Sequence, residues 1–156
     1  MLGVYTLTGF RGRIRRRDFW GGLLLLLLFE AMLMLGFSGL MRPTGATPIE
    51  EATALFALAM LLWVSAALTV KRLHDRDKSA LWYPLFGLAP ALCYHLGNVY
   101  SSNISHVLSP AQRFFWILGG ALWLWALVEL GFMPGSKGPN RHGPDPRDAA
   151  KAPATA

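Results

Sequence analysis

The sequence RRRDFWGGLLLLLLFEAMLMLGFSGL, residues 15–40, places three arginines directly before an apolar run of 22 residues that begins at Phe19. A helix of about 20 apolar residues crosses the ~30 Å hydrocarbon core of a bilayer. Three further apolar stretches, of 19, 19 and 20 residues, follow along the chain. The sequence therefore predicts an all-α integral membrane bundle of four transmembrane helices, with spans at about residues 19–40, 52–70, 81–99 and 114–133.

The basic residues are divided unequally among the hydrophilic segments that flank these spans. The segment before the first span, the loop between the second and third, and the segment after the fourth together hold 13 Lys and Arg residues, whereas the other two loops hold 2. Segments on the cytoplasmic side of a membrane carry an excess of Lys and Arg. We therefore expect a multi-pass protein of the cytoplasmic membrane with both termini in the cytoplasm.

The distribution of apolar and basic residues divides the chain into three regions. Residues 1–18 mix apolar side chains with five arginines, which predicts a basic segment lying at the membrane interface. Residues 19–133 form the transmembrane domain, and its loops are too short to hold a soluble catalytic domain. Residues 134–156 are rich in Pro, Gly and Ala, which predicts a largely unstructured cytoplasmic tail.

The net charge of +6 indicates an anionic partner. Because the basic residues lie next to the ends of the spans, anionic phospholipid at the cytoplasmic face is the partner that we expect. Nucleic acid is not expected, since few aromatic side chains lie away from the membrane boundary to stack on bases. The single cysteine, Cys93, lies inside the third span, so one chain cannot form a disulfide or a multi-cysteine metal site, and no cofactor is expected.

Three blocks of polar and aromatic residues occupy the three basic segments. The blocks are Phe10-Arg11-Gly12-Arg13-Ile14-x-Arg16-x-Asp18-Phe19-Trp20, then Lys71-Arg72-Leu73-His74-Asp75 with Ser79 and Trp82, then Pro134-Gly135 with Gly138, Asn140-Arg141 and Gly143-Pro144-Asp145-Pro146. In this order and spacing they resemble the DUF805 family of small bacterial inner-membrane proteins. The resemblance covers residues 8–147 and implies a four-helix protein of the bacterial inner membrane with no assigned activity.

The chain departs from the family pattern at two places. Residues 76–80 contain no glycine, whereas the family usually has a glycine-containing turn there, so we expect this loop to turn differently. In the tail, His142 stands where the family usually has tyrosine. All three blocks fall on the cytoplasmic side of the topology that the charges predict.

Glu30 is the most unusual ionisable residue, because it lies 11 residues after Phe19, about 16 Å into the first span. An acid at this depth is costly and is a candidate proton carrier or cation ligand. The alternative is structural: a protonated Glu30, or one hydrogen-bonded to a Ser, Thr or Trp of a neighbouring span. Glu129 lies near the inner end of the fourth span, where we favour an ion pair with interfacial arginines.

His74 and Asp75, together with His142 and Asp145, are candidates for a metal site or an acid–base pair. We favour a structural interpretation, in which Asp75 binds Arg11, Arg13 or Arg72 and His74 caps a helix end. That interpretation ties the loop after the second span to the N-terminal block. The remaining candidate polar positions, functional or structural, are Arg11, Arg13, Arg16, Arg72, Asn140 and Arg141.

The function that we expect is a non-enzymatic membrane component that binds anionic lipid and a membrane-protein partner, or a second copy of itself, through its cytoplasmic face. A small transporter or channel component that uses Glu30 is the alternative. A membrane enzyme that uses His74 and Asp75 is the third class; no P-loop, Gly-x-Ser-x-Gly or His-Glu-x-x-His pattern is present in the sequence.

Overall fold

The computed structural model describes residues 8–40, 47–99 and 108–148. The regular elements of this part of the chain are all helices and it contains no strand, so the all-α prediction is confirmed for it. The α-helices are α2 (Arg16–Leu40), α3 (Pro48–Asp75), α4 (Ala89–Val99) and α5 (Pro110–Ala126). Three short elements interrupt or extend them: the 3₁₀ helix η1 (Ala80–Trp82) and the π-helices η2 (Pro84–Leu88) and η3 (Leu127–Phe132).

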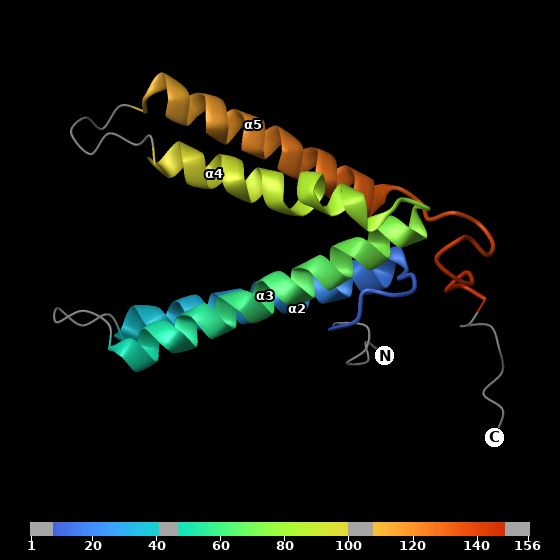
Figure 1. Ribbon diagram of the computed structural model, residues 1–156, viewed down its shortest axis with the longest axis horizontal. Helices are drawn as coiled ribbons and strands as arrows, with labels where there is room; N and C mark the ends of the chain where they lie inside the picture. The colour runs from blue at the N-terminus through green and yellow to red at the C-terminus, as the bar shows by residue number, and fades with distance from the viewer. Residues whose placement is uncertain (1–7, 41–46, 100–107, 149–156) are drawn as a thin grey trace.

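The helices form two hairpins that meet at one end and diverge at the other (Figure 1). α2 packs beside α3, and α4 packs beside α5. Contacts between the hairpins are made by η1, η2 and η3, which lie at the converging end. The N-terminal segment and the tail lie at the same end, so segments far apart in the sequence meet there (Figure 1).

Local sequence signals account for the starts of α3 and α5 at the divergent end. Thr47 caps α3 through a capping box with Glu50, and Pro48 fits the first helical turn, where its missing N–H is not needed. Ser109 caps α5 by accepting a hydrogen bond from the Gln112 backbone N–H at 3.1 Å.

The loop after α3 turns through a left-handed residue that is not glycine. Asp77 has a φ of 56°, a conformation that aspartate adopts more readily than most residues. The sequence predicted a different turn because residues 76–80 lack glycine; in the structure Asp77 takes the left-handed position that a glycine would otherwise supply. The chain then enters η1, with Ser79 preceding its first residue.

The third apolar segment is irregular, as its two prolines predict. Pro84 lacks a backbone donor and begins η2, and only residues 89–99 are regular α-helix. α4 then approaches α5 closely at Gly119, where an added Cβ would lie 3.0 Å from the Cys93 Cβ. The second π-helix, η3 at the end of α5, was not predicted from the sequence.

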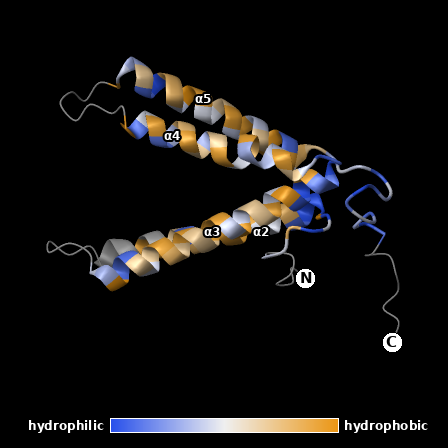
Figure 2. Ribbon diagram, in the orientation of Figure 1, coloured by the Kyte–Doolittle hydropathy of each residue, from blue (hydrophilic) through white to orange (hydrophobic). Residues whose placement is uncertain are grey.

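The buried core lies at the converging end of the hairpins. It consists of Ile14, Phe19, Leu68, Leu73, Phe86, Ala126 and Leu130. Away from it, large apolar side chains on all four helices are exposed, and Figure 2 shows apolar ribbon along most of both hairpins.

Two of the described helical segments are long and apolar enough to cross a membrane: Pro48–Asp75, of 28 residues, and Pro110–Phe132, of 23 residues. Only 17% and 28% of their most apolar windows are buried inside the protein. Helices of a soluble core bury such surface, so these segments need an apolar environment outside the chain.

Candidate functional site

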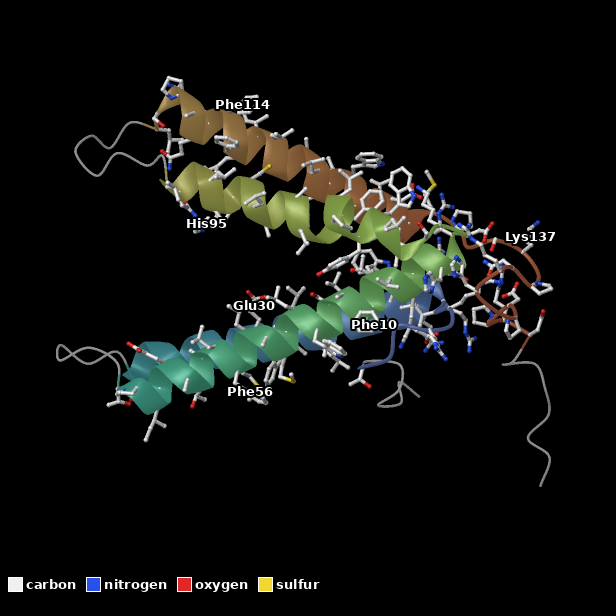
Figure 3. All side chains as sticks on the ribbon, in the orientation of Figure 1. Phe10, Glu30, Phe56, His95, Phe114 and Lys137 are labelled. Atoms are coloured by element: carbon white, nitrogen blue, oxygen red, sulfur yellow. The ribbon has the colours of Figure 1, made fainter. Side chains whose placement is uncertain are left out.

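The charged and polar residues gather where the hairpins converge, in a region that we call the polar junction: residues 11–16, 72–78 and 129–147. Figure 2 shows hydrophilic ribbon concentrated at this end, and Figure 3 shows its side chains crowded together around the tail. The junction brings together the end of α3, the segment before α2 and the tail after η3. These are the three blocks singled out in the sequence.

Asp75 lies at the centre of the junction and binds two arginines. Its Oδ1 accepts from Arg13 Nε at 3.2 Å and from Arg13 Nη2 at 3.0 Å, and its Oδ2 accepts from Arg72 Nη1. The side chains of Arg13, Arg72 and Asp75 are 1%, 0% and 6% exposed. This geometry agrees with the ion-pair interpretation of Asp75, with Arg13 and Arg72 rather than Arg11 as the partners.

Arg13 also joins the tail to the N-terminal segment. Its Nη1 donates to the Gly138 carbonyl at 2.8 Å, and its Nη2 donates to the Ser136 carbonyl at 2.7 Å. Ser136 in turn donates its backbone N–H to the Asp75 carbonyl at 2.8 Å. Residues 134–148 are thus held in a defined, non-helical path, unlike the unstructured tail that their composition suggests. The physical reason is that these backbone groups find charged partners in the junction.

A second set of hydrogen bonds satisfies the backbone carbonyls at the end of the fourth helical segment. The last carbonyls of a helix have no partner inside it and carry its negative dipole end. Here five successive carbonyls, those of residues 130–134, accept from side chains of the other hairpin. The donors are Arg72 Nε for Leu130 (2.6 Å), Trp20 Nε1 for Gly131 (3.0 Å), Arg16 Nη1 for Phe132 (3.0 Å), Arg72 Nη2 for Met133, and Arg76 Nη1 for Pro134 (2.6 Å).

Glu129 binds two cations of the loop after α3. Its Oε1 lies 3.0 Å from Arg76 Nη2 and 2.7 Å from Lys78 Nζ. Lys78 also lies over the Trp82 ring, 4.9 Å from the centroid. The ion pair expected between Glu129 and an interfacial arginine is present with Arg76, and Lys78 is a second cationic partner.

The two inner histidines stack on each other. The rings of His74 and His142 have centroids 3.9 Å apart and planes inclined by 7°. His74 Nδ1 lies 3.1 Å from the Gly12 carbonyl, so His74 binds the N-terminal segment instead of capping a helix end. Asn140 donates from Nδ2 to the His74 carbonyl at 2.9 Å and fixes the tail beside the end of α3.

Arg141 and Asp145 make further polar contacts that hold the tail in place. Arg141 lies 3.3 Å from Asp77 Oδ1 and donates to the Asp77 carbonyl at 2.6 Å. Asp145 accepts from Arg147 and from the Gly138 backbone N–H. The hydrogen bonds from Arg147 hold the pKa of the Asp145 carboxyl well below its usual range.

The junction offers little for metal or acid–base chemistry. Asp75 and Asp145 each face arginines, and in the part of the chain that the structure describes no three His, Cys, Asp or Glu residues are placed to hold a metal ion. The proposed grouping of His74, Asp75, His142 and Asp145 therefore reduces to a histidine stack and two separate ion pairs.

Three cations at this end of the molecule have no partner among the described residues. Arg11, Arg17 and Lys137 are exposed and make no ion pair or hydrogen bond with any described residue. Lys137 points away from the helices at the turn of the tail (Figure 3).

Glu30 lies apart from the junction, midway along α2, and its side chain is exposed. Figure 3 shows Glu30 and His95 directed toward the space between the two hairpins, from opposite sides. Among the described residues neither side chain makes a hydrogen bond or ion pair. The hydrogen bond expected from a Ser, Thr or Trp of a neighbouring span is therefore not formed by these residues.

Sequence reasoning missed Arg76 and Lys78 as members of the junction, missed Trp20 as a donor to it, and missed the backbone carbonyls as acceptors. One signal was present: Arg72 and Arg76 are four residues apart and so lie on one face of α3. Nothing in the sequence identifies which carbonyls such a face meets.

Comparisons with known proteins find a matching family and similar sequences. The family model described as a protein of unknown function (DUF805) matches residues 7–144. The uncharacterized protein YiiR of Escherichia coli K12 is 36% identical over 155 residues, covering 91% of this chain and 88% of YiiR. The inner membrane protein YhaH of the same organism is 29% identical over 146 residues, covering 89% of this chain and 88% of YhaH. No solved structure matches.

Proposed function

The chain belongs to the DUF805 family, as its three sequence blocks indicated, and from this membership and the junction we propose a four-span inner-membrane protein that binds anionic phospholipid at its cytoplasmic face. The role is non-enzymatic: the junction holds the two hairpins in place and presents free cations to the headgroups. YhaH is named an inner membrane protein, which supports the location.

Helix lengths support four spans. α2 has 25 residues, and Glu30 is its only ionisable residue after Asp18. Residues 80–99 are continuously helical, and 20 helical residues extend about 30 Å, the thickness of a hydrocarbon core. Together with the two segments that satisfy length and composition, these would give the four crossings that we propose. The exposed apolar side chains along both hairpins would then face lipid.

The lipid proposal rests on a difference between two groups of cations. Some bind protein groups inside the junction, and others are exposed with no partner among the described residues. Arg13, Arg72 and Arg76 are used inside the junction, whereas Arg11 and Arg17 are exposed beside the start of α2. Basic residues beside a span contribute about 1 kcal/mol each in attraction to an anionic leaflet. We expect a membrane-protein partner or a second copy to associate through the helix faces that the diverging hairpins leave uncovered.

Native mass spectrometry of the protein in nanodiscs tests the lipid proposal. Nanodiscs made of phosphatidylglycerol and phosphatidylethanolamine in equal amounts should release protein that retains phosphatidylglycerol preferentially. The variant Arg11→Gln/Arg17→Gln/Lys137→Gln should lose most of this preference, because it removes three cations of the junction end that make no contact with a described residue.

Arg113→Gln is the matched control, since Arg113 is an exposed cation at the opposite end of the molecule. Its lipid preference should equal that of the wild type. Equal retention of the two lipids by the wild type, or an unchanged preference in the triple variant, would count against the proposal. Crosslinking in membranes followed by mass spectrometry would identify the protein partner.

A transporter role is the second candidate, and the placement of Glu30 and His95 favours it. Glu30 lies 14 residues beyond Arg16, and His95 lies 15 residues beyond Ala80, so each is about 21 to 23 Å from the converging end. Two ionisable side chains at similar depth, facing one space, fit an ion path better than Glu30 alone.

Reconstituted vesicles with a pH or cation gradient test this candidate. The transporter hypothesis requires that the wild type dissipates the gradient and that Glu30→Gln does not. Glu51→Gln, which changes an exposed acid in the first turn of α3, is the control and should behave as the wild type. We expect no dissipation by the wild type, which would leave the lipid-binding role as the better supported one.

A further inference from the structure

The stacked pair His74–His142 is the contact in the junction whose side chains change charge nearest to neutral pH. It joins three segments: His74 lies in the last turn of α3, its Nδ1 meets the Gly12 carbonyl of the N-terminal segment at 3.1 Å, and His142 belongs to the tail. A carbonyl oxygen only accepts, so His74 Nδ1 carries a hydrogen. In the neutral ring His74 Nε2 is then unprotonated.

The tautomer of His142 follows from Arg141 in the same way. Arg141 Nε lies 3.1 Å from His142 Nε2, and a guanidinium only donates. His142 Nε2 is therefore an acceptor without a hydrogen. A proton added there would remove this hydrogen bond and set a positive charge against the guanidinium.

Burial opposes protonation of both rings and outweighs the hydrogen bond from His74 to the Gly12 carbonyl, which favours the charged form. Arg13 of the N-terminal segment and Arg141 of the tail are the cations that face it, and Asp77 of the loop after α3 is the acid. Burial and the guanidinium of Arg141 lower the pKa of His142 below 6.5, and the smaller opposing effect of Asp77 does not reverse this. Protonation of both rings would place two like charges 3.9 Å apart.

We propose that the stacked His74–His142 pair is an acid-sensitive contact that holds the tail on the junction at neutral pH and releases residues 136–147 when the pH on that side of the membrane falls. Release breaks the contacts that Asn140 and Arg141 make with the end of α3. It also removes the Ser136 and Gly138 carbonyls from Arg13.

The sign of the effect follows from the direction of the shift. A base whose pKa is lowered in the docked state stabilises docking fully above its undocked pKa, near 6.5, and this contribution is lost as the pH falls through the docked value. The carboxyl of Asp145 stays ionised throughout this range, because Arg147 holds its pKa well below the usual value. Loss of docking between neutral pH and about pH 5.5 would therefore report the histidines.

Hydrogen–deuterium exchange of the full-length protein in nanodiscs tests the proposal. Protection factors of backbone amides in residues 136–147, corrected for the intrinsic pH dependence of exchange, are compared at about pH 7.5 and about pH 5.5. We expect protection of the tail to fall by about tenfold, the effect of one coupled proton per pH unit. Peptides from α4 and α5 should keep their protection, because the change is local to the junction.

His142→Tyr is the matched variant, since tyrosine keeps a flat ring over His74 and does not titrate in this range. Its tail should be protected equally at both pH values. An unchanged tail in the wild type, or the same loss of protection in His142→Tyr, would overturn the proposal.

NMR titration of the wild-type histidine rings makes the test independent of how the variant folds. The His142 ring should gain its proton below pH 6.5, together with the loss of tail protection. Protonation of that ring with the tail still protected would also overturn the proposal.

Discussion

Replacing Asp75 by asparagine should be among the most destabilising conservative changes in this chain. Asp75 is a carboxylate 6% exposed between Arg13 and Arg72, whose side chains are 1% and 0% exposed. Asparagine keeps the shape and one acceptor oxygen, but it leaves two buried guanidinium groups without a counter-charge. Removing one partner from a buried ion pair costs about 3 to 5 kcal/mol, and we expect Asp75→Asn to cost about 3 kcal/mol because the amide oxygen still accepts.

Unfolding by sodium dodecyl sulfate in mixed detergent micelles, followed by tryptophan fluorescence, measures this cost. The indole of Trp20 donates to the Gly131 carbonyl at 3.0 Å, so its emission should report the integrity of the junction. Asp18→Asn is the matched control. Its ion pair with Arg15 joins side chains that are 43% and 38% exposed, and such pairs contribute at most about 1 kcal/mol.

The pairing with Arg13 is resolved by a double-mutant cycle. Arg13→Gln should be less costly in the Asp75→Asn background than in the wild type, with a coupling energy of about 0.5 to 3 kcal/mol. The reasoning fails if Asp75→Asn costs no more than Asp18→Asn, or if the two substitutions at positions 13 and 75 are additive.

Three more results are expected, two from the same unfolding titration and one from hydrogen–deuterium exchange. Gly135→Ala should cost about 1 to 3 kcal/mol, because the added Cβ would overlap the Asp75 carboxylate, whereas Gly120→Ala meets open space and should be neutral or slightly stabilising; equal effects would contradict the packing described. Glu129→Gln should cost about 1 to 3 kcal/mol by leaving Arg76 and Lys78 without their acid, and no loss would show that the pair is not formed. The Asp145 carboxylate should contribute to tail docking down to about pH 4, and this contribution should be lost only under more acidic conditions. Exchange protection of the tail in Asp145→Asn should therefore differ from that in the wild type at neutral pH. Identical protection would exclude a role for the carboxylate.

The helices were predictable from the sequence because their signals are local. Apolar length indicated each helical segment, and Pro84 indicated the irregular start of the third. The pairing of Asp75 with arginines was also predictable, since an acid within a basic cluster needs counter-charges from nearby blocks.

The rest of the junction could not be predicted because its acceptors are backbone groups. Any residue can supply a carbonyl, so nothing in the sequence marks Leu130 or Met133 as partners of Arg72. The π-helix η3 likewise has no compositional signal. The stacking of His74 on His142 depends on the path of a tail whose composition suggests no fixed structure.

Cysteine labelling in whole cells tests the proposed orientation of the junction most directly. In a Cys93→Ala background, single cysteines replace Thr44, Ser102 and Lys137, one variant for each position. Thr44 and Ser102 lie in the two segments outside the described residues that connect the helices of each hairpin, and Lys137 is exposed in the tail. A membrane-impermeant maleimide should label cysteines at positions 44 and 102, and should label position 137 only after the cells are lysed. Labelling of position 137 in intact cells, with positions 44 and 102 protected, would contradict a cytoplasmic junction.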